Sequence, residues 1–244
     1  MPSDTGYPSY PAELLPDHHW WMAGRFRALS AVLDRSVPQG GEALDVGSGT
    51  GGWAAMLATH FETVWLAEPD AHLHRTLCAD GRFGTKAVHT SLPGPMPFRS
   101  GQFNLVSCFE VLEHIDDDEG AAGELHRVTA PGGRLFVTVP AHPKLWSSMD
   151  EQVGHRRRYT RAALRDLLVK AGFLPRLLAP FNVWLYPPAA LMRRFDRVGD
   201  ATPPRPVNLV LSGLLASEGR LAHRWPGWVR GLSWMCLAER VPRP

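Results

Sequence analysis

The sequence predicts an α/β protein with a doubly wound, mostly parallel sheet. Short apolar strands alternate with helical segments over the first 140 residues, and a glycine-rich turn follows the first of those strands. This alternation is typical of a parallel sheet covered by helices on both faces, because a parallel strand pair needs a long crossover connection. Ligands of such sheets bind beyond the carboxyl ends of the strands. The glycine-rich turn therefore marks the expected binding edge.

Chain composition fits one globular domain with elaborated ends: 244 residues, 44% hydrophobic and 20% charged. The three cysteines are widely spaced and form no C-x-x-C pair, which argues against a disulfide framework and a zinc site. The first 16 residues show no signal-peptide pattern, and the longest uncharged stretch, residues 177–192, is too short to span a bilayer. We therefore expect a cytoplasmic protein without a transmembrane helix.

The positions of the helices and strands follow from apolar periodicity, capping residues and turn residues. Helices are predicted over residues 20–34, 53–60, 70–78, 118–129 and 161–171. Strands are predicted over 43–46, 63–67, 87–89, 103–108, 134–139, 174–181 and 231–239, with a turn at 130–133 before the fifth. The expected organisation is an N-terminal segment with a lid helix (1–36), a binding core (37–183), a helical insertion (184–230), and a final strand with its tail (231–244).

The glycine-rich turn has the pattern G-x-G-x-x-G at Gly47, Gly49 and Gly52, typical of nucleotide-binding turns between a strand and a helix. Asp45 lies inside the preceding strand, where a carboxylate suits a cationic group such as the amino group of a methionine moiety; a turn-stabilising acid is the alternative. Glu68 ends the next strand, where a carboxylate can accept both hydrogen bonds of a ribose diol or simply face solvent. No lysine follows the turn, which excludes a P-loop.

Three segments resemble motifs of class I S-adenosylmethionine-dependent methyltransferases, in the order of that family: Leu44–Gly51, Phe109–Ile115 and Leu125–Gly133. Three further segments are similar to a bacterial branch of it: His19-Trp20-Trp21-x-x-x-Arg25, Gly154–Thr160 and Gly231–Ser233. The resemblance implies a Rossmann-like methyltransferase fold with an N-terminal helical lid and a C-terminal helical insertion before the last strand. It also implies S-adenosyl-L-methionine as the cofactor.

The same resemblance implies which residues contact the cofactor. The methionine part would be surrounded by Asp45, Gly47, Ser48, Gly49 and Gly51, the ribose by Glu68 and Pro69, and the sulfonium by Cys108, Phe109 and Glu110. The family often places an acid near the adenine, but this chain has Ser91 and Leu92 there, so backbone groups are expected to replace it. From the lid, Arg25 is expected to approach the cofactor carboxylate, and Trp20 or Trp21 to cover the methionine end.

The predicted proton acceptor is His155, because histidine titrates near neutral pH. Its neighbours Arg156, Arg157 and Arg158 would keep the ring neutral if they point the same way. Tyr159 is the second candidate, and a purely structural His155 is the alternative. No metal site is expected, because the acids of residues 116–118 begin a helix, where carboxylates act as caps.

The predicted function is methyl transfer to oxygen, or less readily to nitrogen or carbon, of a small or medium-sized metabolite, with secondary metabolism as the setting. A nicotinamide-dependent oxidoreductase and a non-catalytic cofactor-binding scaffold are the alternatives. Residues 1–150 carry 10 basic against 18 acidic side chains, and residues 151–244 carry 16 against 6. The basic, apolar insertion predicts a cap over an anionic small-molecule acceptor, with a homodimer contact or a peripheral membrane contact as alternatives. No nucleic-acid partner is expected.

Overall fold

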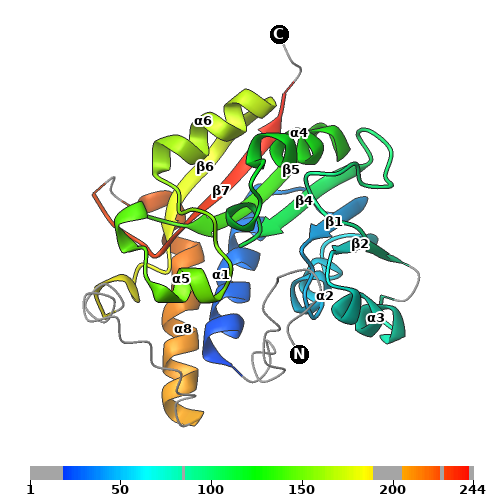
Figure 1. The fold of residues 1–244 in the computed structure, drawn as a ribbon. Helices are drawn as coiled ribbons and strands as arrows, with labels where there is room; N and C mark the ends of the chain where they lie inside the picture. Colours follow the sequence, from blue (N-terminus) through cyan, green and yellow to red (C-terminus); the bar gives the residue numbers. More distant parts are fainter. Residues whose placement is uncertain (1–18, 84–85, 189–204, 226–227, 242–244) are drawn as a thin grey trace.

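The computed structural model describes residues 19–83, 86–188, 205–225 and 228–241. In this part of the chain, a seven-stranded sheet has the order β3-β2-β1-β4-β5-β7-β6 (Figure 1). Its strands are β1 (Glu42–Val46), β2 (Thr63–Glu68), β3 (Ala87–His89), β4 (Phe103–Phe109), β5 (Thr129–Pro140), β6 (Phe173–Phe181) and β7 (Ser233–Arg240). Only the pairs made by β7 are antiparallel among these strands. The predicted doubly wound, mostly parallel sheet is confirmed.

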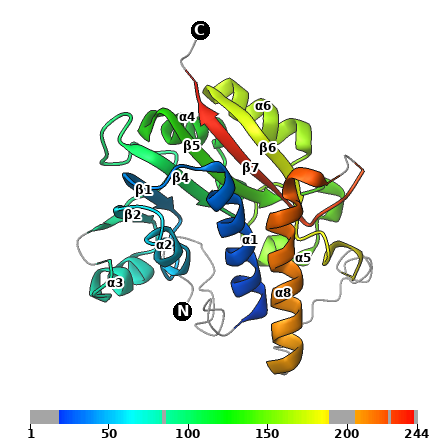
Figure 2. The same ribbon diagram turned by 180° about the vertical axis from the view of Figure 1, so that it is seen from behind.

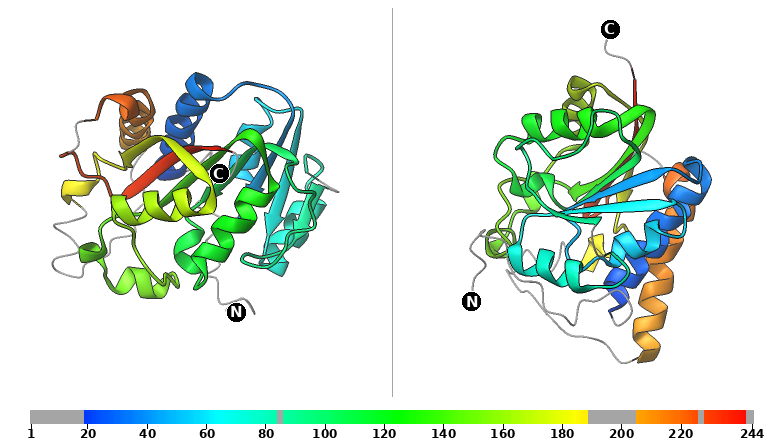
Figure 3. Two further views of the ribbon diagram at one scale, coloured as in Figure 1. Left: turned by 90° about the horizontal axis from the view of Figure 1, so that it is seen from above. Right: turned by 90° about the vertical axis from the view of Figure 1, so that its right-hand side faces the viewer.

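Helices cover both faces of this sheet. The described helices are α1 (Trp20–Ser36), α2 (Gly52–Leu57), α3 (Ala71–Ala79), α4 (Asp118–Val128), α5 (Ser148–Gln152), α6 (Arg161–Ala171) and α8 (Arg205–Leu221), with short 3-10 turns η3 (Leu112–His114), η4 (Pro143–Leu145) and η5 (Ala222–Arg224). Helices α4 and α6 lie on one face, and α1 and α8 lie side by side on the other (Figures 2 and 3). Each face has its own apolar core.

Local signals fixed several boundaries where they were predicted. Asp70 caps α3 by accepting hydrogen bonds from two backbone N–H groups, and Thr160 caps α6. Helix α6 ends at Gly172, whose φ of 101° is readily adopted only by glycine. Asp117 caps α4 through the N–H of Gly120, so the acid run does begin a helix as predicted.

Two of the predicted boundaries differ from the structure by three residues or more. Helix α2 ends at Leu57, three residues earlier than expected, and β5 begins at Thr129 rather than at Arg134. Thr129 pairs with Phe103, the register then shifts, and Arg134 pairs with Leu105. The predicted turn at 130–133 is therefore an irregularity within β5, made possible by the positive φ of Gly132.

The predicted lid helix and the predicted insertion pack against each other as one helical layer. A Cβ on Gly24 of α1 would lie 2.7 Å from the Cβ of Leu215, and a Cβ on Gly219 of α8 would collide with the carbonyl oxygen of Ala28. The side chain of Asn208 on α8 accepts the N–H of Trp20, 2.8 Å away, at the start of α1. Residues 189–204 and 226–227 of the predicted insertion lie outside the described residues. No helix in the described ranges is long and apolar enough to cross a membrane.

The close backbone contact between α1 and α8 makes a stability prediction. Gly219→Ala should destabilise the protein by about 1–3 kcal/mol, because its methyl group has no room beside Ala28. Gly213→Ala is the matched control on the same helix: its Cβ would meet no atom within 4 Å, so it should stabilise by up to about 1 kcal/mol through helix propensity. Denaturant unfolding of both variants measures the difference. Equal effects of the two substitutions would contradict this packing.

Candidate active site

Backbone strain collects at the carboxyl edge of the sheet. Among the described residues, the non-glycine positions with positive φ are Glu110, His142 and Asn182, at 54°, 58° and 58°. They follow the carboxyl ends of β4, β5 and β6, and the glycine turn follows that of β1. Strained backbone of this kind clusters at functional sites. The strained residues and the glycine turn therefore indicate the same edge of the sheet.

The glycine turn is fixed by backbone hydrogen bonds and leaves open space at its centre. The N–H of Gly47 donates to the carbonyl of Ala67 at 2.8 Å, and the N–H of Gly51 donates to the carbonyl of Ser48 at 2.9 Å. Gly47, Gly49 and Gly51 all have positive φ. A Cβ on Gly47 would meet Val111, whereas a Cβ on Gly49 would meet nothing within 4 Å. Gly49 is thus where a ligand can approach the backbone closely.

Asp45 is a buried carboxyl group directly below this turn. Its Oδ1 accepts a hydrogen bond from the hydroxyl of Ser107 at 2.8 Å, and the residue is only 3% exposed. Burial raises the pKa of Asp45 to about 7; the hydrogen bond from Ser107 opposes this and the charge of Glu68 adds to it. A cationic group bound nearby would favour the ionised form.

Glu68 links the end of β2 to the glycine turn. Its Oε2 accepts the N–H of Gly49 at 2.7 Å, and its Oε1 accepts the N–H of Asp70 at 2.9 Å. Burial raises the pKa of Glu68 despite these two bonds. Each carboxylate oxygen keeps a further lone pair, so the group can still accept hydrogen bonds from a ligand diol.

The other residues expected around the cofactor differ in accessibility. Pro69 is half-buried and its carbonyl lies 2.9 Å from Nε2 of His89. Ser91 is exposed, and Leu92 packs on the core below α4 and α6. Cys108 belongs to the same core with no exposed surface, and burial raises the pKa of its thiol.

Ser48 and Phe109 have internal contacts that support the site from below. The Ser48 hydroxyl donates to the carbonyl of Asp45 at 2.8 Å. The ring of Phe109 packs edge-on against Trp53 and Phe136 on the α1 face of the sheet.

Arg25 of α1 reaches the strained residue Glu110. Its Nη2 lies 2.8 Å from Oε1 of Glu110, and its guanidinium lies over the ring of Trp21, 5.3 Å from the centroid. Burial acts against ionisation of Glu110, but the charge of Arg25 and the hydrogen bonds with Glu113, Arg25 and Thr138 together hold the pKa of Glu110 below its usual value. The charge of Arg25 is therefore already paired within the protein. Trp20 and Trp21 are half-buried at the start of α1.

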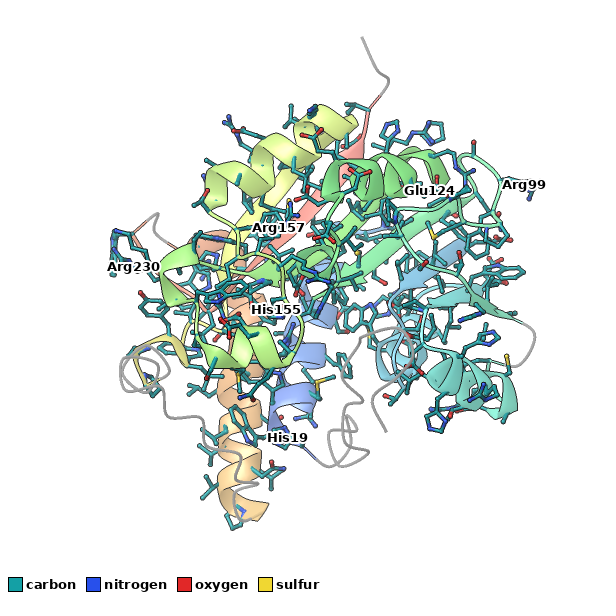
Figure 4. The ribbon with its side chains drawn as sticks, viewed as in Figure 1. His19, Arg99, Glu124, His155, Arg157 and Arg230 are labelled. Carbon is teal, nitrogen blue, oxygen red and sulfur yellow. The ribbon has the colours of Figure 1, made fainter. Side chains whose placement is uncertain are left out.

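His155 lies on the loop after α5 and is labelled near the middle of the view in Figure 4. Its Nδ1 is 2.8 Å from Oδ1 of Asp150, which has no exposed surface. Burial works against ionisation of Asp150, but hydrogen bonds from His155 and Arg158 hold the pKa of that carboxyl well below its usual range. An ionised Asp150 places the ring proton of neutral His155 on Nδ1, which leaves the lone pair on Nε2. Nε2 lies 3.9 Å from Oε1 of Glu113.

We predicted that the arginines after His155 would act together on its imidazole if they pointed the same way. In the structure each of them contacts an acid instead. Arg158 is buried, and its guanidinium lies 2.7 Å from Oδ1 of Asp150. Arg157 lies 2.9 Å from Oδ2 of Asp118, and Arg156 lies 3.7 Å from Asp116. These ion pairs hold the loop in place.

Tyr159 is nearly inaccessible. Its hydroxyl donates to Oδ2 of Asp118 at 2.7 Å. Burial, together with this contact, raises the pKa of Tyr159 far above its usual value. These contacts favour His155 over Tyr159 as the proton acceptor.

Asp150 orients His155, and we did not predict this role from the sequence. A local signal was present, because Ser147 and Asp150 have the spacing of a capping box. Oδ2 of Asp150 accepts the N–H of Ser147 at 2.9 Å, which leaves Oδ1 for the imidazole. Glu113 and His114 were named only as part of a motif, and the structure places both beside His155.

An open groove lies between α1 and α8 and reaches Met56 of α2, the helix that follows the glycine turn. Arg27 and Arg220 line it from the two helices, together with small residues such as Gly213. Near the start of α8, Val207, Leu209 and Val210 are 46–70% exposed. The basic, apolar character expected of the insertion is thus present on this layer.

Comparisons with known proteins agree with this geometry. Residues 21–176 match the family model described as a methyltransferase domain. A probable chloroplastic tocopherol O-methyltransferase of Oryza sativa subsp. japonica is 32% identical over 125 residues, 48% of this chain and 34% of that protein. A ubiquinone biosynthesis O-methyltransferase of Pseudomonas aeruginosa is 27% identical over 145 residues, 53% of this chain and 61% of that protein.

A solved structure shares the fold. The geranyl diphosphate C-methyltransferase of Streptomyces coelicolor, crystallised with Mg²⁺, geranyl diphosphate and S-adenosyl-L-homocysteine, has a TM-score of 0.60 at 16% identity. The match covers 88% of this chain and 77% of that one. Because the family model spans well over half of the sequence and the sheet order and glycine turn agree with it, the chain belongs to the class I S-adenosylmethionine-dependent methyltransferases.

Proposed function

We propose that this protein transfers the methyl group of S-adenosylmethionine to an oxygen atom of a small or medium-sized metabolite, with nitrogen or carbon as the less favoured acceptor atom. The observation that carries the proposal is His155, held by a buried, ionised Asp150 at the carboxyl edge of the sheet. A hydroxyl acceptor must lose a proton as the methyl group arrives, and an oriented imidazole can take it. The O-methyltransferases among the relatives support oxygen as the acceptor atom.

The residues of the glycine turn fit the cofactor. Open space at Gly49 admits the cofactor against the backbone, Glu68 can accept the ribose hydroxyls, and Asp45 can face the amino group. When bound, S-adenosylmethionine supplies an electrophilic methyl group on a sulfonium. We further propose that Arg25 and the half-buried Trp21 close the methionine end from α1.

The proton of the acceptor hydroxyl would pass to Nε2 of His155. Asp150 holds Nδ1–H and stabilises the imidazolium that forms, without taking the proton itself, because hydrogen bonds from His155 and Arg158 hold the pKa of Asp150 well below its usual range. The strained backbone at Glu110 and His142 frames the space where the acceptor would lie. The protein's part in catalysis is thus positioning and proton removal.

We also propose that the arginines of the α1–α8 layer favour an acceptor carrying carboxylate or phosphate. Arg27 and Arg220 line the open groove together with one acid, Asp34, and this excess of basic groups supports an anionic partner. Release of S-adenosyl-L-homocysteine with a panel of catechols, hydroxybenzoates and their phosphorylated analogues tests both acceptor atom and charge. Turnover only with amines or carbon nucleophiles would overturn the oxygen assignment.

The cofactor assignment makes a binding prediction at Gly49. Gly49→Val should abolish binding of S-adenosyl-L-homocysteine, because the side chain would fill the open space at the turn. Gly132→Val is the control, since Gly132 also has positive φ and open surroundings but lies in β5, away from the site. Both variants carry similar backbone strain, of about 1–2 kcal/mol. Calorimetry should show binding in the control alone; retained binding by Gly49→Val would refute this cofactor position.

Asp45 predicts a pH dependence of cofactor affinity. With a pKa of about 7, the group is mostly protonated at pH 6 and mostly ionised at pH 8. Only the ionised form attracts an ammonium group, so affinity for S-adenosyl-L-homocysteine should rise about 10-fold over this range, with proton release on binding. Asp45→Asn should bind more weakly at pH 8 and lose most of the dependence. A parent protein with pH-independent affinity would exclude this role.

His155 predicts a split between turnover and binding. His155→Ala should lower kcat by about 10²-fold or more while cofactor affinity stays nearly constant. Asp150→Asn should lower kcat and alter the pH–rate profile, because it removes the charge that orients the ring. His74→Ala, on α3, is the control and should retain activity. Parallel losses of cofactor affinity and thermal stability in His155→Ala would instead mark His155 as structural.

A further inference from the structure

Glu113, His114 and His155 form a compact cluster, of which the proposed proton transfer uses His155 alone. One ligand atom from each residue lies within 4.8 Å of the others. Glu113 and His114 belong to η3 after β4, whereas His155 comes from the loop after α5. The two imidazole rings meet edge to face with centroids 4.8 Å apart.

Glu113 is a buried carboxyl group without a hydrogen-bond donor. It has no exposed surface, and neither of its oxygens accepts a hydrogen bond from the described part of the chain. A buried carboxyl in this situation requires either a proton or a cation. The carboxyl group of Glu110 lies close to that of Glu113, and burial together with the charge of Glu110 raises the pKa of Glu113 well above its usual value.

The surrounding groups are arranged for a cation. Nδ1 of His155 lies 2.8 Å from the carboxylate of Asp150, and Nδ1 of His114 lies 3.3 Å from the carbonyl oxygen of Gly154. Histidines that ligate metals usually donate their other ring N–H to a carboxylate or carbonyl in this way. Nε2 of His155, with its lone pair, lies on the side of Glu113.

The donor set indicates the kind of ion. Two imidazoles and one carboxylate suit Zn²⁺, Co²⁺ or Fe²⁺, whereas Mg²⁺ and Ca²⁺ prefer oxygen ligands. Ligand atoms about 2.0–2.2 Å from a shared ion lie at most about 4.4 Å apart. In tetrahedral geometry they lie about 3.4 Å apart, so the cluster would need to contract by roughly 1.4 Å from its present 4.8 Å.

We propose that Glu113, His114 and His155 bind a single divalent transition-metal ion. The three protein ligands would leave coordination positions open toward the carboxyl edge of the sheet. The ion would lower the pKa of a coordinated acceptor hydroxyl. This goes beyond the proposed function. Nε2 of His155 can hold either the ion or the proton of the acceptor, but not both. The same cluster could therefore assist deprotonation in two alternative ways, through the ion or through the imidazole.

Cobalt provides a direct test, because Co²⁺ bound to protein nitrogen and oxygen ligands absorbs visible light. The full chain, freed of metal with a chelator, is titrated with Co²⁺ and, by calorimetry, with Zn²⁺. We expect equimolar binding with cobalt bands, which Glu113→Gln and His114→Ala abolish. Asp150→Asn should weaken binding about 10- to 100-fold, as expected for a residue that orients a ligand. His142→Ala is the control, because His142 is a partly buried histidine outside the cluster, and it should bind normally.

Two results would overturn the proposal: a wild-type protein that binds neither ion in equimolar amount, or binding that persists in both Glu113→Gln and His114→Ala. Thermal melts of the metal-free proteins exclude misfolding, and Glu113→Gln should remain stable because it retains the shape of the side chain. The test is independent of methyl transfer. Cobalt binding without turnover on any acceptor would refute the proposed function alone, and turnover by protein that binds no ion would refute the ion alone.

Discussion

Buried carboxyl groups at one edge of the sheet are the constraint on which the site depends. A carboxyl removed from water must gain hydrogen bonds, a counter-ion or a proton. Asp150 accepts hydrogen bonds from Ser147, His155 and Arg158, and it stays ionised. Asp45 has one hydroxyl donor among the side chains, and Glu113 has no donor in the described part of the chain. A buried carboxyl group with few hydrogen bonds or ion pairs from the protein is the one for which we propose a ligand as the missing partner.

The number of protein contacts separates carboxyl groups that support the site from those that we propose to face a ligand. Asp150 acts on a ligand only through His155, because both of its oxygens are already engaged. Glu68 is intermediate: two backbone N–H groups hold it, yet its pKa remains raised and its remaining lone pairs are available. Removal of the Asp150 side chain would leave the buried Arg158 without its ion-pair partner. Loss of Asp150 would therefore affect the whole loop.

Local chemistry explains what the sequence could predict. The caps Asp70 and Thr160 act within three residues of themselves, and they placed α3 and α6 closely. The glycine turn was recognisable for the same reason, since its positive φ angles demand glycine.

Features that depend on distant contacts were not predictable in this way. The fit of Gly219 against Ala28 joins residues almost 200 positions apart, and the shifted start of β5 depends on its pairing with β4. The cluster at Glu113 was missed because His155 is 42 residues further along the chain. The sequence drew attention instead to consecutive acids, which act as caps.

The α1–α8 layer links the outer surface of the protein to this edge. Arg25 extends from α1 to Glu110 after β4, and Glu218 of α8 accepts the N–H of Trp184 after β6 at 3.1 Å. Burial raises the pKa of Glu218 to about 7. Movement of either helix would therefore disturb residues that follow the strands at the site, which makes the helical layer part of the site's support.

The charge of the carboxyl edge also bears on which form of the cofactor it favours. Asp45 and Glu68 have no lysine or arginine partner among the ion pairs of the described residues. S-adenosylmethionine carries a sulfonium charge that its demethylated product lacks. In their ionised form, these two carboxyl groups attract the substrate form of the cofactor more strongly than the product form. If they hold the cofactor as we propose, the loss of the sulfonium charge on methyl transfer weakens binding and favours release of the product.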